Sequence, residues 1–170
     1  MKPSLTSEDE FLEVLEDHKK LIFKISGAYF PEKEERKDLF QEIVLQLWKA
    51  FPSYKKEYAY STWIYRIALN VSISFLRKKG KRSKNIQLLK EDMISVDWED
   101  NLQQERLELL YKAIEKLPPL DKAIMLMVLE GFKHAEIAEV MGLSATNVSS
   151  KIHRIKQKLS SNLNPQKQQK

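Results

Sequence analysis

The chain has 170 residues, a length that allows one large or two small domains, and its 42% hydrophobic and 31% charged residues are typical of a globular protein in water. The formal net charge is only +5, cysteine is absent, and His18, His134 and His153 show no metal-ligand spacing, so neither disulfides nor a metal site is expected. No segment approaches the roughly 18 apolar residues of a membrane span, and the N-terminus lacks the apolar core of a signal peptide, which predicts a cytoplasmic protein without membrane insertion.

The spacing of apolar residues predicts an all-α fold. They recur every three or four residues along most of the chain, and only four glycines and six prolines interrupt the pattern. Proline breaks a helix interior but is accepted in a first turn, so Pro31, Pro52 and the pair Pro118 and Pro119 separate the segments. We expect helices near residues 7–29, 34–51, 60–79, 102–117, 119–130, 134–141 and 145–161. The stretch from residue 80 to about 101 has no sustained period and is the predicted linker.

The predicted helix 34–51 contains the sequence DLFQEIVLQLWKAF, which has two distinct stripes. The apolar stripe, which is expected to pack in a core, contains Leu39, Ile43, Leu47 and Phe51. The polar stripe, which is expected to face outward, contains Asp38, Gln41, Glu42 and Gln46. One stripe can therefore build a domain while the other is available to a partner.

A short polar loop, PSYKKEYAYST at residues 52–62, leads to the next helix and holds three tyrosines and two lysines. Aromatic rings can stack an unpaired base and lysines can hold its phosphates, so the loop is a candidate for binding single-stranded nucleic acid. In helix 60–79 the expected buried face contains Ile64, Ala68, Val71 and Phe75. The opposite face contains Arg66, Asn70 and Arg77, and Trp63 lies near the border between the two faces.

Charge alternates in sign along the chain. Residues 77–84 form a basic cluster without acids, residues 91–108 contain seven acids against the single base Arg106, and the last twenty residues are again basic and free of acids. This alternation suggests two nucleic-acid-facing modules joined by an acidic segment. The alternative for any one charge run is a solvated surface, which is about equally common.

Residues 130–159, EGFKHAEIAEVMGLSATNVSSKIHRIKQKL, have the pattern of a helix-turn-helix that ends in a basic helix. Gly142 can adopt the positive φ that a sharp corner requires, and Ala138 leaves room for close helix crossing. Ser144 is a suitable N-cap for the second helix, whereas Lys133 is a weaker start for the first helix than Ser or Thr. This pattern points to DNA.

The second helix of this pair has a face suited to the major groove. Its apolar face contains Val148, Ile152, Ile155 and Leu159. Its opposite face contains Thr146, Asn147, Ser150, His153, Arg154 and Gln157. Small polar groups near the N-terminal end can reach base edges, and cations further along can neutralise phosphates. The alternative is an ordinary amphipathic helix pair with a solvated polar face.

Taken together, DLFQEIVLQLW and YSTWIYRIALNVSISFLRKK, followed by LPPLDKAIMLMVLEGFKHAEIAEVMGLSATNVSSKIHRIKQKL, resemble bacterial RNA polymerase sigma factors of the extracytoplasmic-function group. The resemblance covers most of the chain. It implies two small helical domains joined by a flexible linker: a region 2 domain at 1–80, the linker at 81–104, a region 4 helix-turn-helix domain at 105–163 and a tail at 164–170.

The resemblance implies partners for the first domain. Region 2.2 of the family docks on the β′ clamp helices of core RNA polymerase, which assigns this contact to Asp38, Gln41, Glu42, Gln46 and Trp48. The family captures a base flipped from the minus-ten element, which implies DNA contacts for Tyr54, Lys55, Lys56, Tyr58, Tyr60, Ser61, Thr62, Trp63, Arg66, Asn70 and Arg77. The alternatives are exposed polar positions of a packed helix and, for Trp63, a core or interface tryptophan.

Region 4 of the family binds the minus-thirty-five element. This implies contacts with base edges for Thr146, Asn147 and Ser150, and contacts with phosphates for Lys151, His153, Arg154 and Lys156. Asn147 could instead serve the helix terminus. Helix 119–130 is expected to be mostly core, with some apolar surface for the β flap of the polymerase. The acidic linker either runs toward the RNA exit path, as in the family, or is a disordered spacer.

The expected function is promoter specificity rather than catalysis. The protein joins core polymerase, its two domains read two promoter elements, and the first domain traps melted DNA without a cofactor. An anti-sigma factor is a further partner that the family implies. A stand-alone dimeric helix-turn-helix regulator is the alternative, but DLFQEIVLQLW would then have no role. An enzyme acting on nucleic acid is a third reading, for which the sequence offers no catalytic constellation.

Overall fold

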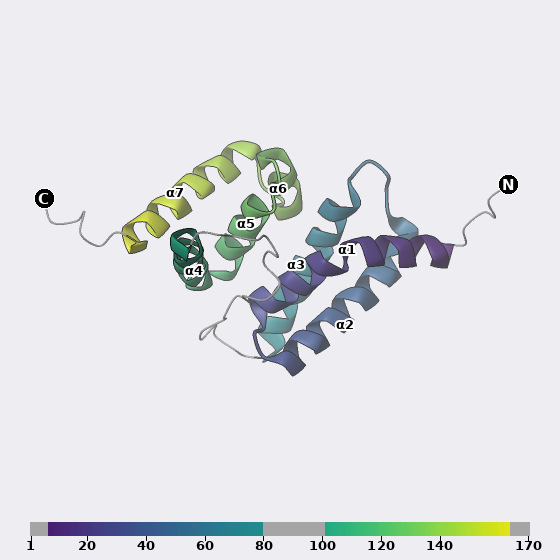
Figure 1. Ribbon diagram of the computed structural model, residues 1–170. Helices are drawn as coiled ribbons and strands as arrows, with labels where there is room; N and C mark the ends of the chain where they lie inside the picture. The colour runs from purple at the N-terminus through teal and green to yellow at the C-terminus, as the bar shows by residue number, and fades with distance from the viewer. Residues whose placement is uncertain (1–6, 80–100, 164–170) are drawn as a thin grey trace, which may run out of the picture. The chain divides into compact units, whose positions relative to one another are not determined.

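The computed structural model describes residues 7–79 and 101–163, and within these ranges it contains seven α-helices, one short 3-10 helix and no strand (Figure 1). The all-α prediction is confirmed, and the helices begin and end close to the expected residues. Contacts divide the chain into two units, Met1–Lys84 and Asn85–Lys170. The predicted tail and most of the predicted acidic linker lie outside the described residues. None of the described helices is long and apolar enough to span a bilayer.

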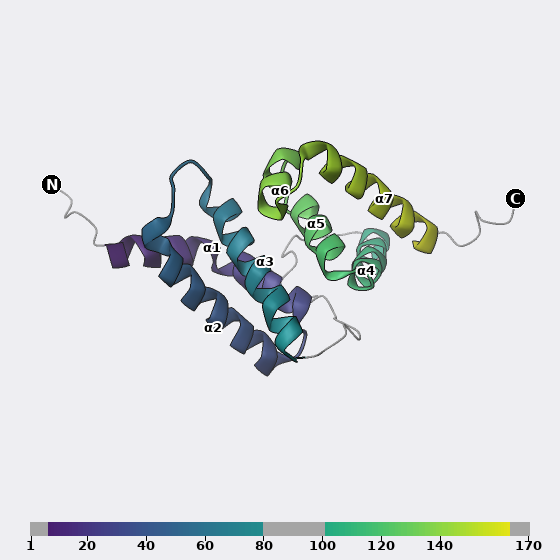
Figure 2. The ribbon, with the colours of Figure 1, turned by 180° about the vertical axis from the view of Figure 1, so that it is seen from behind.

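The first unit consists of α1 (Ser7–Tyr29), α2 (Lys33–Ala50), the 3-10 turn η1 (Phe51–Ser53) and α3 (Tyr60–Lys79). Each of its three α-helices packs against the other two, as Figure 2 shows from behind. The predicted apolar stripe of α2 is buried along its whole length, from Leu39 to Phe51. Pro52 lies in the first turn of η1, so α2 ends at Ala50 rather than at residue 51.

The buried face of α3 differs in part from the prediction. Two of the four expected residues are buried, but Val71 and Phe75 are only partly buried, and Leu69 and Leu76 lie in the core instead. Because α3 packs against both α1 and α2, its buried stripe is wider than one row of residues at i, i+4. Phe75 lies at the edge of this stripe, where its ring meets Phe30 edge-on at 5.3 Å.

The second unit consists of α4 (Asn101–Glu115), α5 (Pro119–Leu129), α6 (His134–Met141) and α7 (Ala145–Leu163). The last helix contacts each of the other three and runs from α6 past α5 to α4 (Figure 1). All four residues of its predicted apolar face are buried. The six consecutive residues from Lys122 to Met127 in α5 are buried too, which confirms that this helix is mostly core.

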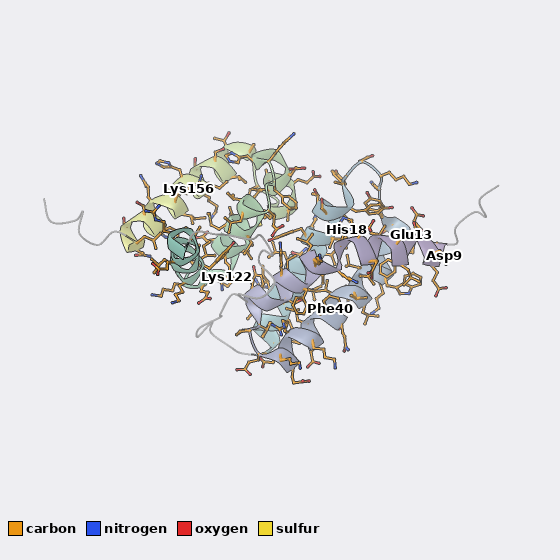
Figure 3. The ribbon with its side chains drawn as sticks, viewed as in Figure 1. Asp9, Glu13, His18, Phe40, Lys122 and Lys156 are labelled. Carbon is orange, nitrogen blue, oxygen red and sulfur yellow. The ribbon has the colours of Figure 1, made fainter. Side chains whose placement is uncertain are left out.

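Among the residues that the structure describes in the second unit, one charged side chain is buried. Lys122, which Figure 3 labels on α5, is only 1% exposed. Its burial lowers the pKa of the Lys122 ammonium to about 8, and the Glu115 carboxylate opposes this effect by favouring the charged form. The core therefore holds a group whose charge depends on pH near the upper end of the physiological range.

The corner between α6 and α7 forms as the sequence predicts. Gly142 has a φ of +65°, in the left-handed region that L residues avoid. The N–H of Leu143 donates to the carbonyl of Ala138 at 2.9 Å, and the N–H of Gly142 donates to the carbonyl of Glu139 at 3.3 Å. These two bonds close the end of α6 in a Schellman motif, which directs the chain into the next helix.

The two helices of this pair are capped in different ways. Ser144 Oγ accepts a hydrogen bond from the backbone N–H of Asn147 at 3.2 Å, which confirms it as the N-cap of α7. The ammonium group of Lys133 can donate hydrogen bonds but cannot accept them, so its side chain cannot cap the backbone N–H groups of α6. Instead the Glu136 carboxylate accepts from the backbone N–H of Lys133 at 2.7 Å, and this bond compensates for the weak cap.

Gly142→Ala is expected to lower the free energy of unfolding of the second unit by roughly 1–2 kcal/mol. A Cβ at this position meets nothing within 4 Å, so the cost comes from the backbone conformation and not from a clash. Urea titration followed by circular dichroism measures the change. Gly142→Asn is the control, since Asn tolerates the left-handed region and should lose less. Equal stability of all three proteins would contradict the prediction.

Candidate functional site

The polar residues of α2 that the sequence singles out lie on its accessible side. Asp38, Gln41 and Trp48 are exposed, and Trp48 is 43% exposed. Glu42 and Gln46 are partly buried, and the Gln46 amide donates to the Glu42 carboxylate at 2.8 Å. These five residues therefore border a single surface that combines carboxylates with a large aromatic ring.

An apolar groove adjoins this surface, and the sequence analysis missed it. It has a volume of about 420 Å³ and is lined by Glu8, Phe11, Leu12, Leu15, Phe40, Gln41, Val44, Leu45 and Trp48. Leu12 is 53% exposed and Leu45 is 44% exposed, although both are large and apolar. The lining residues come from α1 and α2, and Figure 3 labels Phe40 on α2. Contiguous exposed apolar residues of this kind mark interaction sites.

The signal for the groove was present in the sequence. In DLFQEIVLQLW, Phe40, Val44, Leu45 and Trp48 lie off the stripe that packs the core. A helix with one buried face needs apolar residues on that face only, so a second apolar row predicts a second contact. From the sequence alone, however, the row could equally be covered by another helix of the same domain.

Three aromatic residues of the predicted minus-ten surface gather in one place, here called the aromatic cluster: Tyr54, Tyr60 and Trp63. The rings of Tyr54 and Tyr60 stack with centroids 4.5 Å apart and an angle of 23° between their planes. The ring centroid of Trp63 lies 5.1 Å from that of Tyr54 and 6.2 Å from that of Phe51. Trp63 is therefore at the border between core and surface. The cluster thus joins the loop to the first turn of α3.

The hydroxyl of Tyr60 is a donor at neutral pH. It donates to Glu10 Oε1 at 3.1 Å. Desolvation raises the pKa of Tyr60, and the hydrogen bond and the charge of Glu10 raise it further, so the hydroxyl stays protonated. Partial desolvation also raises the pKa of Tyr54. The hydroxyl of Tyr54 donates to the backbone carbonyl of Tyr58 within the loop.

The remaining residues of the predicted minus-ten surface differ in accessibility. Lys55, Lys56, Tyr58, Arg66, Asn70 and Arg77 are exposed, and Ser61 is partly exposed. Thr62 is the exception, because it is only 5% exposed and faces the core of the unit. Thr62 therefore cannot offer its side chain to DNA without a rearrangement, and we remove it from the candidate surface. The residue lies one turn before buried positions of α3, which explains its orientation.

The predicted recognition face of α7 is open along its length. Thr146, Asn147, Ser150, His153, Arg154 and Lys156 are all exposed. Lys151 is only partly exposed, and its ammonium lies 3.4 Å from the Asp121 carboxylate of α5. Because Ser144 caps the helix terminus, the side chain of Asn147 is not needed for that role. The surface thus has small polar groups first and cations after them.

Both units resemble known protein families. The family model described as Sigma-70 region 2 matches residues 14–82, and that described as Sigma-70, region 4 matches residues 107–159. The ECF RNA polymerase sigma-E factor of Haemophilus influenzae is 30% identical over 156 residues, which are 84% of this chain and 82% of the relative. The sigma-E factor of Escherichia coli is 28% identical over 140 residues, covering 75% and 73%.

Solved structures share the fold. The sigma factor RpoE of Bartonella quintana, in complex with the anti-sigma factor NepR, has a TM-score of 0.67 at 18% identity and covers 92% of this chain and 96% of its own. CnrH, in complex with the cytosolic domain of CnrY, has a TM-score of 0.65 at 19% identity, with 92% and 88% covered. Since the Haemophilus relative matches more than four fifths of this chain at 30% identity and both regions occur in order, the chain belongs to the extracytoplasmic-function group of bacterial RNA polymerase sigma factors.

Proposed function

We propose that this sigma factor directs core RNA polymerase to promoters by binding the minus-thirty-five and minus-ten elements and by trapping melted DNA. The proposal rests on the open recognition helix of the second unit, and the first unit supports it with an aromatic cluster beside a basic helix face. The role is non-catalytic, because RNA synthesis belongs to the polymerase. It is exercised in the cytoplasm, where the polymerase works.

The groove between α1 and α2, together with the polar stripe of α2, is the proposed site for the β′ clamp helices. Leu12, Leu45 and Trp48 line the groove and supply exposed apolar contact area. Asp38 and Glu42 supply negative charge at its border, which suits a basic partner. Apolar contact area with charged residues beside it is typical of protein interfaces.

The double charge reversal Asp38→Lys with Glu42→Lys is expected to weaken binding to core polymerase about tenfold or more, because it sets like charges against a basic partner. Equilibrium binding of fluorescently labelled protein to core enzyme measures the effect. Glu13→Lys is the matched control, since Glu13 is exposed on α1 and is not among the residues that line the groove. Equal losses for both variants would argue against a specific contact on α2.

The aromatic cluster is the proposed site of base capture. Extruding a base costs a few kcal/mol, and stacking it on an aromatic ring returns about 1–3 kcal/mol. Tyr58 and the neighbouring cluster can supply one or two such contacts. Phosphate contacts from Lys55, Lys56, Arg66 and Arg77 add affinity that falls with salt. Asn70 and Ser61 complete the polar surface, and together these residues can hold a nucleated bubble without ATP.

The recognition face of α7 is proposed to read the minus-thirty-five element in the major groove. Thr146, Asn147 and Ser150 lie near its N-terminal end, where a recognition helix reaches base edges. His153 and Arg154 follow on the same open side and are assigned to phosphates. Lys151 lies at the edge of this surface and pairs with Asp121 of α5. It therefore orients α7 against α5 as well as facing DNA.

Asn147→Ala is expected to reduce binding to the minus-thirty-five element by about 1–3 kcal/mol, because Asn can bond an adenine with two hydrogen bonds. Holoenzyme affinity for promoters with each base substituted in turn measures the effect. Asn147→Ala should lower the affinity for promoters that have the preferred base at the contacted position. It should have no effect on promoters in which that base is replaced. Gln157→Ala, three residues past Arg154 on the exposed side, serves as the control. A uniform loss on every sequence would assign Asn147 to phosphate contact instead.

A stand-alone dimeric regulator is not favoured, because the groove and the polar stripe of α2 would have no role in it. The complex of the Bartonella relative with an anti-sigma factor supports a partner of the same class for this chain. The proposed function is tested by transcription of genomic fragments with core polymerase, with and without the protein. New transcripts that begin downstream of a shared pair of sequence elements are expected. Identical transcripts in both reactions would refute the proposal.

A further inference from the structure

Tyr60, the first residue of α3, is fastened to α1 at two points. Its hydroxyl donates to Glu10 Oε1 at 3.1 Å, and its ring meets the edge of the His18 ring with centroids 6.3 Å apart. Glu10 and His18 are separated by about two helical turns and lie on either side of Val14. His18 is itself fixed, because its Nδ1 donates to the carbonyl of Val14 at 2.8 Å. Two residues of α1 therefore contact Tyr60, Glu10 through the hydroxyl and His18 through the ring.

Tyr60 in turn contacts the first residue of the loop that follows η1. Its ring stacks on Tyr54 at 4.5 Å, and the hydroxyl of Tyr54 donates to the carbonyl of Tyr58. The five residues 55–59 are all exposed, so none of their side chains anchors the loop in the core. A series of contacts thus leads from Glu10 through Tyr60 and Tyr54 to Tyr58 in the loop.

We propose that Glu10 is a positioning residue for base capture: through Tyr60 it holds Tyr54 and the exposed loop in the arrangement that receives the unpaired base. This inference rests on the proposed role of the aromatic cluster. A loop that is already ordered loses less conformational entropy when DNA binds, so it binds more tightly. Without the Glu10 carboxylate, the hydroxyl of Tyr60 loses its acceptor, and the edge contact with His18 is then the remaining contact of the Tyr60 ring with α1.

The test uses holoenzymes made with the full-length protein and two DNA probes from a promoter that it transcribes. One probe is fully duplex, and the other is a fork whose non-template minus-ten strand is unpaired and carries 2-aminopurine. Glu10→Ala and Tyr60→Phe should each lower affinity for the fork about fivefold, while affinity for the duplex and for core polymerase stays unchanged. The double variant should be no worse than either single variant, because both remove the same hydrogen bond.

Two further variants separate positioning from loss of charge or of folding. Glu10→Gln keeps an acceptor oxygen and should restore fork binding to within twofold of the wild type. Glu13→Ala removes a carboxylate from the neighbouring turn of α1 and should behave as the wild type. Thermal unfolding of Glu10→Ala should match the wild type, which excludes a general loss of structure.

The outcomes distinguish the inference from the function on which it rests. If the wild type prefers the fork and Glu10→Ala keeps that preference, Glu10 has no positioning role. Additive losses in the double variant, or an equal loss on duplex and fork, lead to the same conclusion. If the wild type itself binds fork and duplex alike, base capture by this loop is wrong, and the role of Glu10 is overturned with it.

Discussion

Leu45→Asp is expected to weaken binding to core RNA polymerase about 100-fold while leaving the first unit folded. The side chain is 44% exposed in the free protein, so a carboxylate there remains hydrated and the fold tolerates it. In the complex the same carboxylate would be buried in an apolar groove without a partner. A desolvation cost of about 2.7 kcal/mol corresponds to the expected 100-fold loss.

The affinity of core enzyme for the labelled variant measures this effect. Leu163→Asp is the matched control, because Leu163 is an exposed leucine at the end of α7 in the other unit. Leu45→Met keeps an apolar side chain of similar volume and should bind as the wild type. If Leu45→Asp binds core enzyme as tightly as the wild type, the groove is not part of the polymerase interface.

Lys122 is expected to make the stability of the second unit rise with pH by about 3 kcal/mol between pH 8 and pH 10.5. Its pKa is about 8 in the folded protein, against 10.5 for an ordinary lysine. Between these values the unfolded chain binds a proton that the folded chain lacks, so raising the pH favours the folded state. Below pH 8 both states are protonated, and the cost of burying the charge is present in full. Above pH 10.5 both are neutral, and that cost is gone.

The contribution of Lys122 is isolated by comparison with Lys122→Met, whose unbranched side chain is one atom shorter and carries no charge. The unfolding free energy of the wild type minus that of Lys122→Met should increase by about 3 kcal/mol across this pH window. Lys116→Met changes an exposed lysine of the same unit and should follow the wild type at every pH. If the difference in unfolding free energy between the wild type and Lys122→Met stays constant with pH, Lys122 keeps its charge in the core.

The local features of this fold were predictable from sequence because each depends on a few neighbouring residues. The apolar stripe of α2 follows from the helical period, and the corner at Gly142 follows from the need for a positive φ. Ser144 caps α7 as its residue type predicts. The polar and apolar faces of α7 separate cleanly because that helix buries only one side.

Features that depend on distant contacts were not predictable. Tyr60 meets Glu10 across 50 positions of the chain, and nothing in either segment indicates the other. Lys122 is buried because α5 is enclosed on nearly all sides, whereas a lysine in a helix is ordinarily exposed. Thr62 was assigned to DNA by its place in the loop motif, but the first turn of α3 rotates it into the core. Packing between helices decides each of these cases.

We infer that polymerase fixes the separation at which the two units read two promoter elements. Run-off transcription with core enzyme and this protein, on templates whose spacer is lengthened by 1, 3 and 5 base pairs, tests it most directly. Transcription should be maximal at one spacing and largely lost at 5 base pairs, where the two elements face opposite sides of the helix, since one turn takes about 10 base pairs. Equal transcript yields at every spacing, or equal yields without the protein, would contradict the claim.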